Sequence, residues 1–95
     1  MLFGVQNQLF PQYDQGVLNK IREAARKTNT LTITYKDSKG EVTVREGEPY
    51  ELKDGGLYMY CYERNSIRLF KLDGILKAKV NVGKTFVPKW PIKIV

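Results

Sequence analysis

Residues 57–70, LYMYCYERNSIRLF, carry the side chains of this sequence that are best suited to hold a ligand. Tyr58, Tyr60 and Tyr62 occupy every second position, and Arg64 and Arg68 follow them. A tyrosine ring can stack on a nucleobase, and the guanidinium fork of arginine matches the geometry of phosphate. This stretch therefore indicates either a cationic, aromatic ligand surface or the interior of a small β-domain.

The alternation within this stretch separates two faces of one strand. Leu57, Met59 and Cys61 form the more apolar set, and we expect them to face the core. The tyrosines then either line a groove or cover a second small core under the helix or the C-terminal segment, with their hydroxyl groups reaching solvent. Both interpretations stay open for Tyr58.

Several kinds of chemistry are missing from the sequence. It contains no histidine, the commonest general base and metal ligand, and its lone Cys61 permits neither an internal disulfide nor a cysteine-based zinc cluster. The acidic residues are expected on polar faces and in turns, without a pair suited to acid–base catalysis. We therefore expect a protein that is not an enzyme and that uses no metal and no cofactor.

The positive charge is concentrated near the C-terminus. The net charge is +6, and residues 71–95 hold six lysines against the single acidic residue Asp73. Such a region favours an anionic partner such as nucleic acid or anionic lipid, although a soluble surface explains it equally well. No apolar run approaches the roughly 20 residues of a membrane span, and the lone cysteine suits a cytoplasmic protein. The lysines are Lys71, Lys77, Lys79, Lys84, Lys89 and Lys93.

The first part of the chain predicts one helix. Residues 14–28 place apolar side chains on one stripe at helical spacing, with Asp14 as the N-cap and Asn29 as the C-terminal stop. Residues 1–12 form an arm with some apolar character, which we expect to pack on the domain or to contact another chain. The predicted organisation is an arm over 1–12, a domain over 13–83 and an extended segment over 84–95.

From residue 30 the period of the apolar residues changes to two, which predicts strands. We expect five of them, over 30–35, 42–52 with an interruption at EGEP (46–49), 57–63, 67–72 and 76–82, and Gly83 should end the last. One helix and five short strands predict a mainly β fold, a small and strongly bent barrel. Trp90, between two prolines, either fixes the tail onto this barrel or serves as an exposed anchor.

A series of motifs in this order resembles the WYL domain family. The series runs Ile33-x-Tyr35, Asp37…Gly40, Arg45…Pro49, Gly56-Leu-Tyr-Met59…Cys61 and Arg68-x-Phe70-x-Leu72-Asp73-x-Ile75, and the similarity covers roughly residues 16–82. The resemblance implies an Sm-like, SH3-type five-stranded β-barrel with an N-terminal helix. It also implies a ligand-sensing domain of bacterial transcription regulators, phage proteins or anti-phage defence systems that binds negatively charged ligands, including nucleotides and single-stranded nucleic acid.

The chain departs from the family pattern at two places. Leu57-Tyr58-Met59 stands where the family has Trp-Tyr-Leu, and Gly74 stands where the family often has a second arginine. No helix-turn-helix fits into the chain beside this domain. We therefore expect either a stand-alone domain encoded by a phage or mobile element, which the initial Met1 favours, or a fragment of a regulator.

Two hypotheses for function follow. In the first, the domain binds nucleic acid or a nucleotide in a regulatory role: Tyr58 stacks on a base, and Arg68 and Arg45 hold phosphate. Arg64 contacts the phosphate backbone of the nucleic acid from a hairpin tip, while Lys71, Lys77 and Lys79 add electrostatic attraction without sequence preference. In the second, the domain is a protein-interaction module whose open strand edges pair with a partner protein or with a second copy of the chain.

Overall fold

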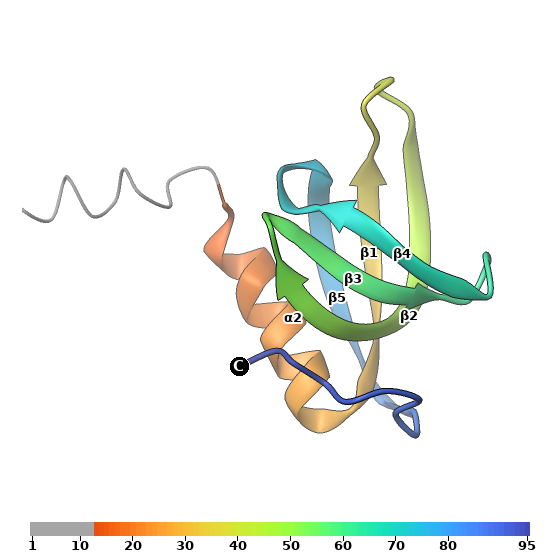
Figure 1. Ribbon diagram of the computed structural model, residues 1–95. Helices are drawn as coiled ribbons and strands as arrows, with labels where there is room; N and C mark the ends of the chain where they lie inside the picture. The colour runs from red at the N-terminus through yellow and green to blue at the C-terminus, as the bar shows by residue number, and fades with distance from the viewer. Residues whose placement is uncertain (1–12) are drawn as a thin grey trace, which may run out of the picture.

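The computed structural model describes residues 13–95, so the arm predicted for residues 1–12 lies outside the described residues. Within these residues, one helix precedes an antiparallel sheet of five strands (Figure 1). The elements are α2 (Gln15–Lys27), β1 (Asn29–Lys36), β2 (Val42–Lys53), β3 (Gly56–Cys61), β4 (Ser66–Lys71), the 3-10 turn η1 (Leu72–Gly74) and β5 (Ile75–Thr85).

Helix α2 begins as the sequence predicts. The Asp14 carboxylate accepts hydrogen bonds from the backbone N–H groups of Gly16 (2.8 Å) and Val17 (3.2 Å), which would otherwise lack partners in the first turn. The predicted stop at Asn29 is one residue late, because Thr28 adopts the left-handed conformation (φ 50°) and Asn29 already begins β1. The apolar stripe of α2 packs against β1, β2 and β5.

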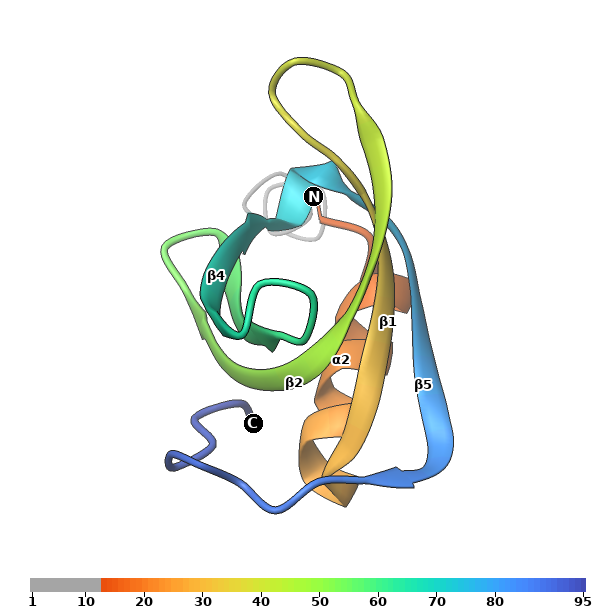
Figure 2. The same ribbon diagram turned by 90° about the vertical axis from the view of Figure 1, so that its right-hand side faces the viewer.

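The sheet is curled but open, so the predicted closed barrel is wrong. Its strand order is β4-β3-β2-β1-β5, and every neighbouring pair is antiparallel. A barrel closes only when its two outer strands pair with each other. Here β4 and β5 each have one partner, and η1 joins them without a ladder between them, as the curled sheet in Figure 2 illustrates.

Strand β2 runs without interruption through EGEP, where the sequence predicted a break. Its pairing with β1 ends at Gly47, and beyond that point β3 is the only strand that pairs with it. A bulge lies between Pro49 and Glu51. A proline fits into a strand at such a place, because one side of the strand has no ladder that needs an N–H and the bulge relaxes the ladder on the other side.

The core forms between the concave face of the sheet and α2. Leu57, Met59 and Cys61 are fully buried, which confirms the assignment of this face of β3 to the core and of the thiol to its interior. Ile21 of α2 and Ile33 of β1 are also fully buried and belong to the same cluster.

The C-terminal segment is fixed against the convex side of β2. The Trp90 ring meets the Tyr50 ring edge-on, with 5.3 Å between ring centroids, and the backbone N–H of Lys93 donates to the Tyr50 carbonyl (2.7 Å). Lys93 also forms a parallel bridge with Glu51. Strand β5 continues through Gly83 to Thr85 instead of ending at Gly83. Trp90 therefore holds the tail on the sheet, the first of its two predicted alternatives.

Candidate ligand site

Three arginines predicted to bind a ligand line one hollow. Arg45 comes from β2, Arg64 from the turn between β3 and β4, and Arg68 from β4. The hollow has a volume of about 190 Å³ and is called the arginine hollow below. It brings together guanidinium groups that lie up to 23 positions apart in the sequence.

The three arginines differ in their partners. Arg45 donates to Glu63 (2.6 Å) and to the Thr43 hydroxyl (3.3 Å), and its side chain is largely covered. Arg64 and Arg68 are exposed, and no carboxylate among residues 13–95 pairs with either of them. The hollow therefore holds one fixed guanidinium and two that are available to an anion.

Aromatic rings form the apolar part of the arginine hollow. Tyr35 and Phe70 line it and meet edge-on with 5.0 Å between ring centroids. The Tyr35 hydroxyl oxygen accepts from the backbone N–H of Lys71 (3.1 Å), which fixes the ring. The carboxylate of Asp37 also faces the hollow, but it accepts the backbone N–H groups of Lys39 and Glu41 within its own turn.

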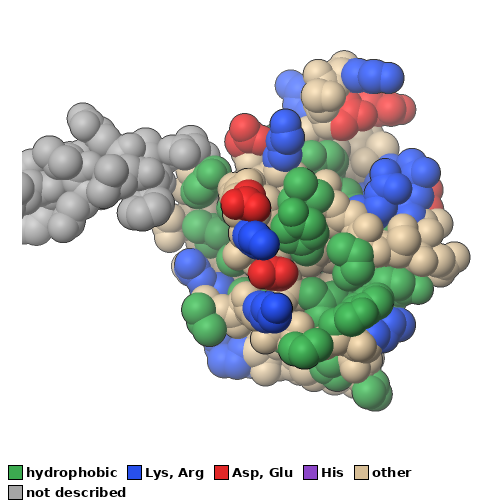
Figure 3. Space-filling view, in the orientation of Figure 1, with side chains coloured by type: hydrophobic (Ala, Val, Ile, Leu, Met, Phe, Trp, Pro, Cys, Tyr) green, Lys and Arg blue, Asp and Glu red, His purple; other side chains and the backbone are tan. Residues whose placement is uncertain are grey.

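The structure does not bring Tyr58 to the three arginines. Tyr58 lies on the opposite face of the sheet, in a second hollow of about 290 Å³, called the aromatic hollow below. Hydrophobic side chains gather around this side of the molecule, over the front strands and the C-terminal segment (Figure 3). The residues that line the aromatic hollow are Tyr50, Glu51, Tyr58, Ile67, Trp90, Pro91 and Lys93.

The predicted lysines are also dispersed. Lys71 lines a third and larger hollow, of about 430 Å³, beside the turn between β1 and β2. Lys36 shares that hollow, but Asp37 and Asp73 line it too, so its charges balance and it is a poorer anion site than the arginine hollow. Lys77 and Lys79 lie exposed on β5, at the other end of the strand order.

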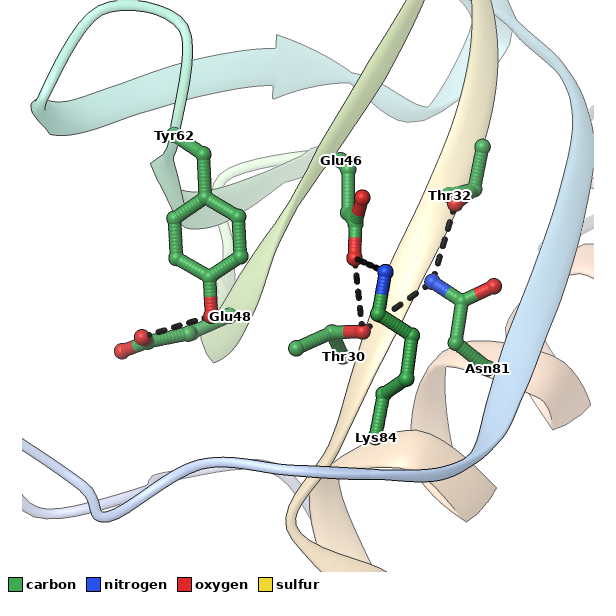
Figure 4. A network of polar contacts seen from close by, with 7 residues as sticks. All are labelled: Thr30, Thr32, Glu46, Glu48, Tyr62, Asn81 and Lys84. Atoms are coloured by element: carbon green, nitrogen blue, oxygen red, sulfur yellow. Dashed lines mark hydrogen bonds and ion pairs between the residues drawn. The ribbon is translucent and has the colours of Figure 1, made fainter.

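Polar side chains link β1, β2 and β5 to one another, and beside them Tyr62 donates to Glu48 (Figure 4). Glu48 is only 2% exposed, contrary to the expectation that the acidic residues lie on polar faces and in turns. Its carboxylate accepts hydrogen bonds from Tyr50 (2.6 Å), Tyr62 (2.9 Å) and Lys89 (2.8 Å). Every buried side-chain nitrogen or oxygen within residues 13–95 has such a partner.

The hydrogen bonds to Glu48 change the pKa values of the carboxyl group and of its tyrosine partners. Burial alone would raise the pKa of Glu48, but the hydrogen bonds from Lys89, Tyr50 and Tyr62 outweigh it and hold that pKa below its ordinary value. Burial and the bond to Glu48 raise the pKa of Tyr50 to about 12 and also raise that of Tyr62. Glu48 is therefore a charged structural group that anchors the tail, and it lies outside the arginine hollow.

The described part of the chain offers neither a metal site nor a membrane-spanning helix. Among residues 13–95, no three His, Cys, Asp or Glu side chains gather as the ligands of a metal ion would. The helix in this range is too short and too polar to cross a membrane.

Comparison with known proteins identifies the family. The model of the WYL domain matches residues 16–80, well over half of the chain. The chain belongs to the WYL domain family. This confirms the resemblance carried by the motifs between Ile33 and Ile75.

Individual relatives of this WYL domain are longer proteins. Over 81 residues it is 41% identical to an uncharacterized HTH-type transcriptional regulator, YobV, of Bacillus subtilis (strain 168), an alignment that covers 80% of this chain and 26% of the regulator. Among solved structures it resembles the proteasome accessory factor B/C (PafBC) of Arthrobacter aurescens, with a TM-score of 0.63 and 22% identity. That match covers 84% of this chain and 14% of the other, and it indicates a shared fold.

Sequence reasoning missed three contributors to these surfaces. Tyr35 appeared only as part of a strand and of the family motif, although its ring meets Phe70 in the arginine hollow. Glu63 was assigned only to a turn, yet it pairs with Arg45 across the end of β3. Trp90 was considered only as a lock or an anchor, although its ring also walls the aromatic hollow. The one sequence signal for the arginine hollow is the alternation of β4, because it places Arg68 and Phe70 on one face. No such signal indicated the three contributors.

Proposed function

We propose that this WYL domain is a non-enzymatic, ligand-binding module that holds a phosphate-bearing ligand, a single-stranded nucleic acid or a nucleotide, in the arginine hollow. One observation carries the proposal: Arg64 and Arg68 line the same hollow as Arg45 and have no carboxylate partner among residues 13–95. Unpaired guanidinium groups beside an aromatic floor suit a phosphate and the sugar or base attached to it.

The regulatory context comes from the relatives. YobV is described as an HTH-type transcriptional regulator, and this chain spans about a quarter of its length. We propose that the domain acts in transcriptional or defence regulation in the cytoplasm, where binding of the ligand is sensed by a larger regulator or by a partner. An origin in a phage or mobile element belongs to the same proposal.

The decisive experiment is a titration of the purified chain into labelled single-stranded and double-stranded oligonucleotides at low and at physiological salt. We expect saturable binding of the single strand that weakens as salt rises, because phosphate contacts release counterions. Arg68→Ala should lose this binding. Arg26→Ala, an exposed arginine on α2, removes the same charge away from the hollow and is the matched control. Equal losses in both variants, or no binding even at low salt, would contradict the proposal.

A second candidate function rests on the open sheet. Among the described residues, no strand pairs with the outer edge of β4 or of β5, and exposed apolar side chains lie along them: Leu69 on β4, and Leu76 and Val82 on β5. Free edges of this kind pair with other chains. We propose pairing with a second copy or with a protein partner as the alternative, and light scattering across a range of concentrations tests the self-association: a strict monomer rules out the homo-oligomer.

A further inference from the structure

The aromatic hollow is a partly open site that is built before any ligand arrives. Trp90 is 46% exposed, yet its ring is held edge-on against Tyr50 (5.3 Å) and tilted against Tyr60 (5.9 Å between centroids). Tyr58 and Ile67 supply the opposite wall from β3 and β4. Fixed rings with free faces lose little conformational entropy when a planar group stacks on them.

The aromatic hollow and the arginine hollow lie on the two sides of one edge strand. Ile67 lines the aromatic hollow, while Arg68, the next residue, lines the arginine hollow. Successive side chains of a strand point to opposite faces, and their partners on β3 follow suit: Tyr60 opposite Ile67 and Met59 opposite Arg68. Because β4 is the last strand of the sheet, Ile67 and Arg68 place the two hollows on the two faces of an edge strand.

We propose that a single strand of nucleic acid passes around the free edge of β4, with its phosphates in the arginine hollow and one of its bases against Tyr58 and Trp90 in the aromatic hollow. This inference rests on the proposed function and sharpens it, because an oligonucleotide can occupy both hollows and a mononucleotide cannot. It also accounts for the separation of Tyr58 from the arginines as a feature of the binding path.

The charges of the two hollows support this division of the ligand. Glu51 and Lys93 both line the aromatic hollow, so its charges balance and its aromatic walls suit an uncharged base better than a phosphate. The arginine hollow differs, since Arg64 and Arg68 have no anionic partner among the described side chains. A proline-rich peptide could also use aromatic walls, but it would leave the neighbouring guanidinium groups unused.

Trp90 makes the proposal directly measurable, because it is the only tryptophan of the chain. The probes are thymidine monophosphate and an oligodeoxythymidine of about ten nucleotides, a length within the range that one small β-fold covers. We expect the oligomer to quench the Trp90 emission as the base stacks on the indole. The mononucleotide should compete with the oligomer for the arginine hollow while it leaves the Trp90 emission unchanged.

Two variants of Tyr58 separate stacking from folding. Tyr58→Leu should weaken the binding of the oligomer roughly 5-fold to 150-fold, the loss expected when one stacked base is released. Tyr58→Phe keeps the ring and should restore most of the affinity. Thermal unfolding of both variants verifies that each is folded.

The outcomes distinguish this inference from the proposed function. Loss of oligomer binding in Arg68→Ala together with quenching of Trp90 and weakening by Tyr58→Leu supports the path around β4. Binding that depends on Arg68 but leaves both the Trp90 emission and the Tyr58→Leu affinity unchanged overturns the path and keeps the arginine site. Absence of oligomer binding overturns both, and quenching by a proline-rich peptide alone assigns the aromatic hollow to a protein.

Discussion

At the scale of single residues, Glu63 sets how much of the arginine hollow is available. Its carboxylate holds Arg45 at 2.6 Å but is itself 66% exposed, so the pair is a partly solvated one and contributes at most about 1 kcal/mol to stability. Glu63→Gln should release the Arg45 guanidinium and tighten oligonucleotide binding by up to roughly 5-fold at low salt. Titration at low salt measures this. The control is Glu23→Gln, which removes the partner of Lys27 on α2. An equal gain in oligonucleotide affinity in this variant would mean that the change in net charge alone explains the effect.

Glu48 predicts a pH dependence of stability. Because its pKa in the folded protein is held below the ordinary value of 4.5, the unfolded chain binds the proton first as the pH falls. The stabilisation by the carboxylate is therefore complete above pH 4.5 and is lost as the pH falls through the lower, folded value. Glu48→Gln should reduce the free energy of unfolding near neutral pH, and the difference from the wild type should shrink in acid.

Chemical denaturation at several pH values between neutrality and about pH 3 tests this prediction. Glu46, whose pKa is also lowered, by its hydrogen bond and ion pair with Lys84, is present in both proteins and cancels in the difference. A difference that stays constant across this range would mean that folding leaves the pKa of Glu48 unchanged, and it would contradict the prediction.

Residue types alone predicted part of this chemistry. The alternation in β3 was sufficient to assign Leu57, Met59 and Cys61 to the core, because burial on one face repeats every second residue. The burial of Glu48 could not be predicted in the same way. Its hydroxyl and ammonium partners come from β2, the turn after β3 and the distant tail, and their convergence exists only after the chain has folded.

At the scale of elements, the close approach of β2 and β3 depends on Gly47. A Cβ atom at this position would overlap the carbonyl oxygen of Tyr60 and press against Met59. Gly47→Ala should therefore lower the free energy of unfolding by about 1–3 kcal/mol, as overpacked sites do. For a domain of this size that loss corresponds to roughly 4–8 °C in melting temperature per kcal/mol.

Gly40→Ala is the control for this comparison. Gly40 has φ +86° but open space around it, so alanine meets backbone strain there without a clash. Thermal unfolding followed by circular dichroism should show the larger loss for Gly47→Ala, and a larger loss for Gly40→Ala would contradict the argument.

The sequence predicted which helix and strands exist better than it predicted whether a strand runs without a break. Asp14 marked the start of α2 because a cap is a local interaction. The Pro49 signal misled, because a proline breaks a strand only where a neighbouring strand needs its N–H, and at Pro49 β3 is the only strand beside β2. Turn residues in the sequence could not reveal which strands pair with β2 on each of its two sides.

At the scale of the whole molecule, the predicted barrel failed for a related reason. Local patterns specify one helix and five strands, but closure depends on whether the first and last strands of the order meet. The short link at Leu72–Gly74 leads from β4 into β5 while the two strands stay unpaired. The same openness exposes the edge of β4, and the path proposed for a nucleic acid requires that edge.

The placement of charge, more than its total, should decide binding. Lys77 and Lys79 lie on β5, whereas Arg64 and Arg68 line the arginine hollow, so two double variants that each remove two positive charges differ only in position. Arg64→Gln with Arg68→Gln should weaken binding of a single strand strongly. It should also make the slope of log affinity against log salt less negative by about 0.7 for each lost phosphate contact.

Lys77→Gln with Lys79→Gln should slow association at low salt and leave most of the affinity and most of that slope in place, since these lysines attract the ligand from a distance. Titrations and stopped-flow association across a salt series measure both quantities. If the two double variants reduced the slope equally, the net charge of +6 would explain binding as a diffuse attraction. The arginine hollow would then have no special role in holding phosphate.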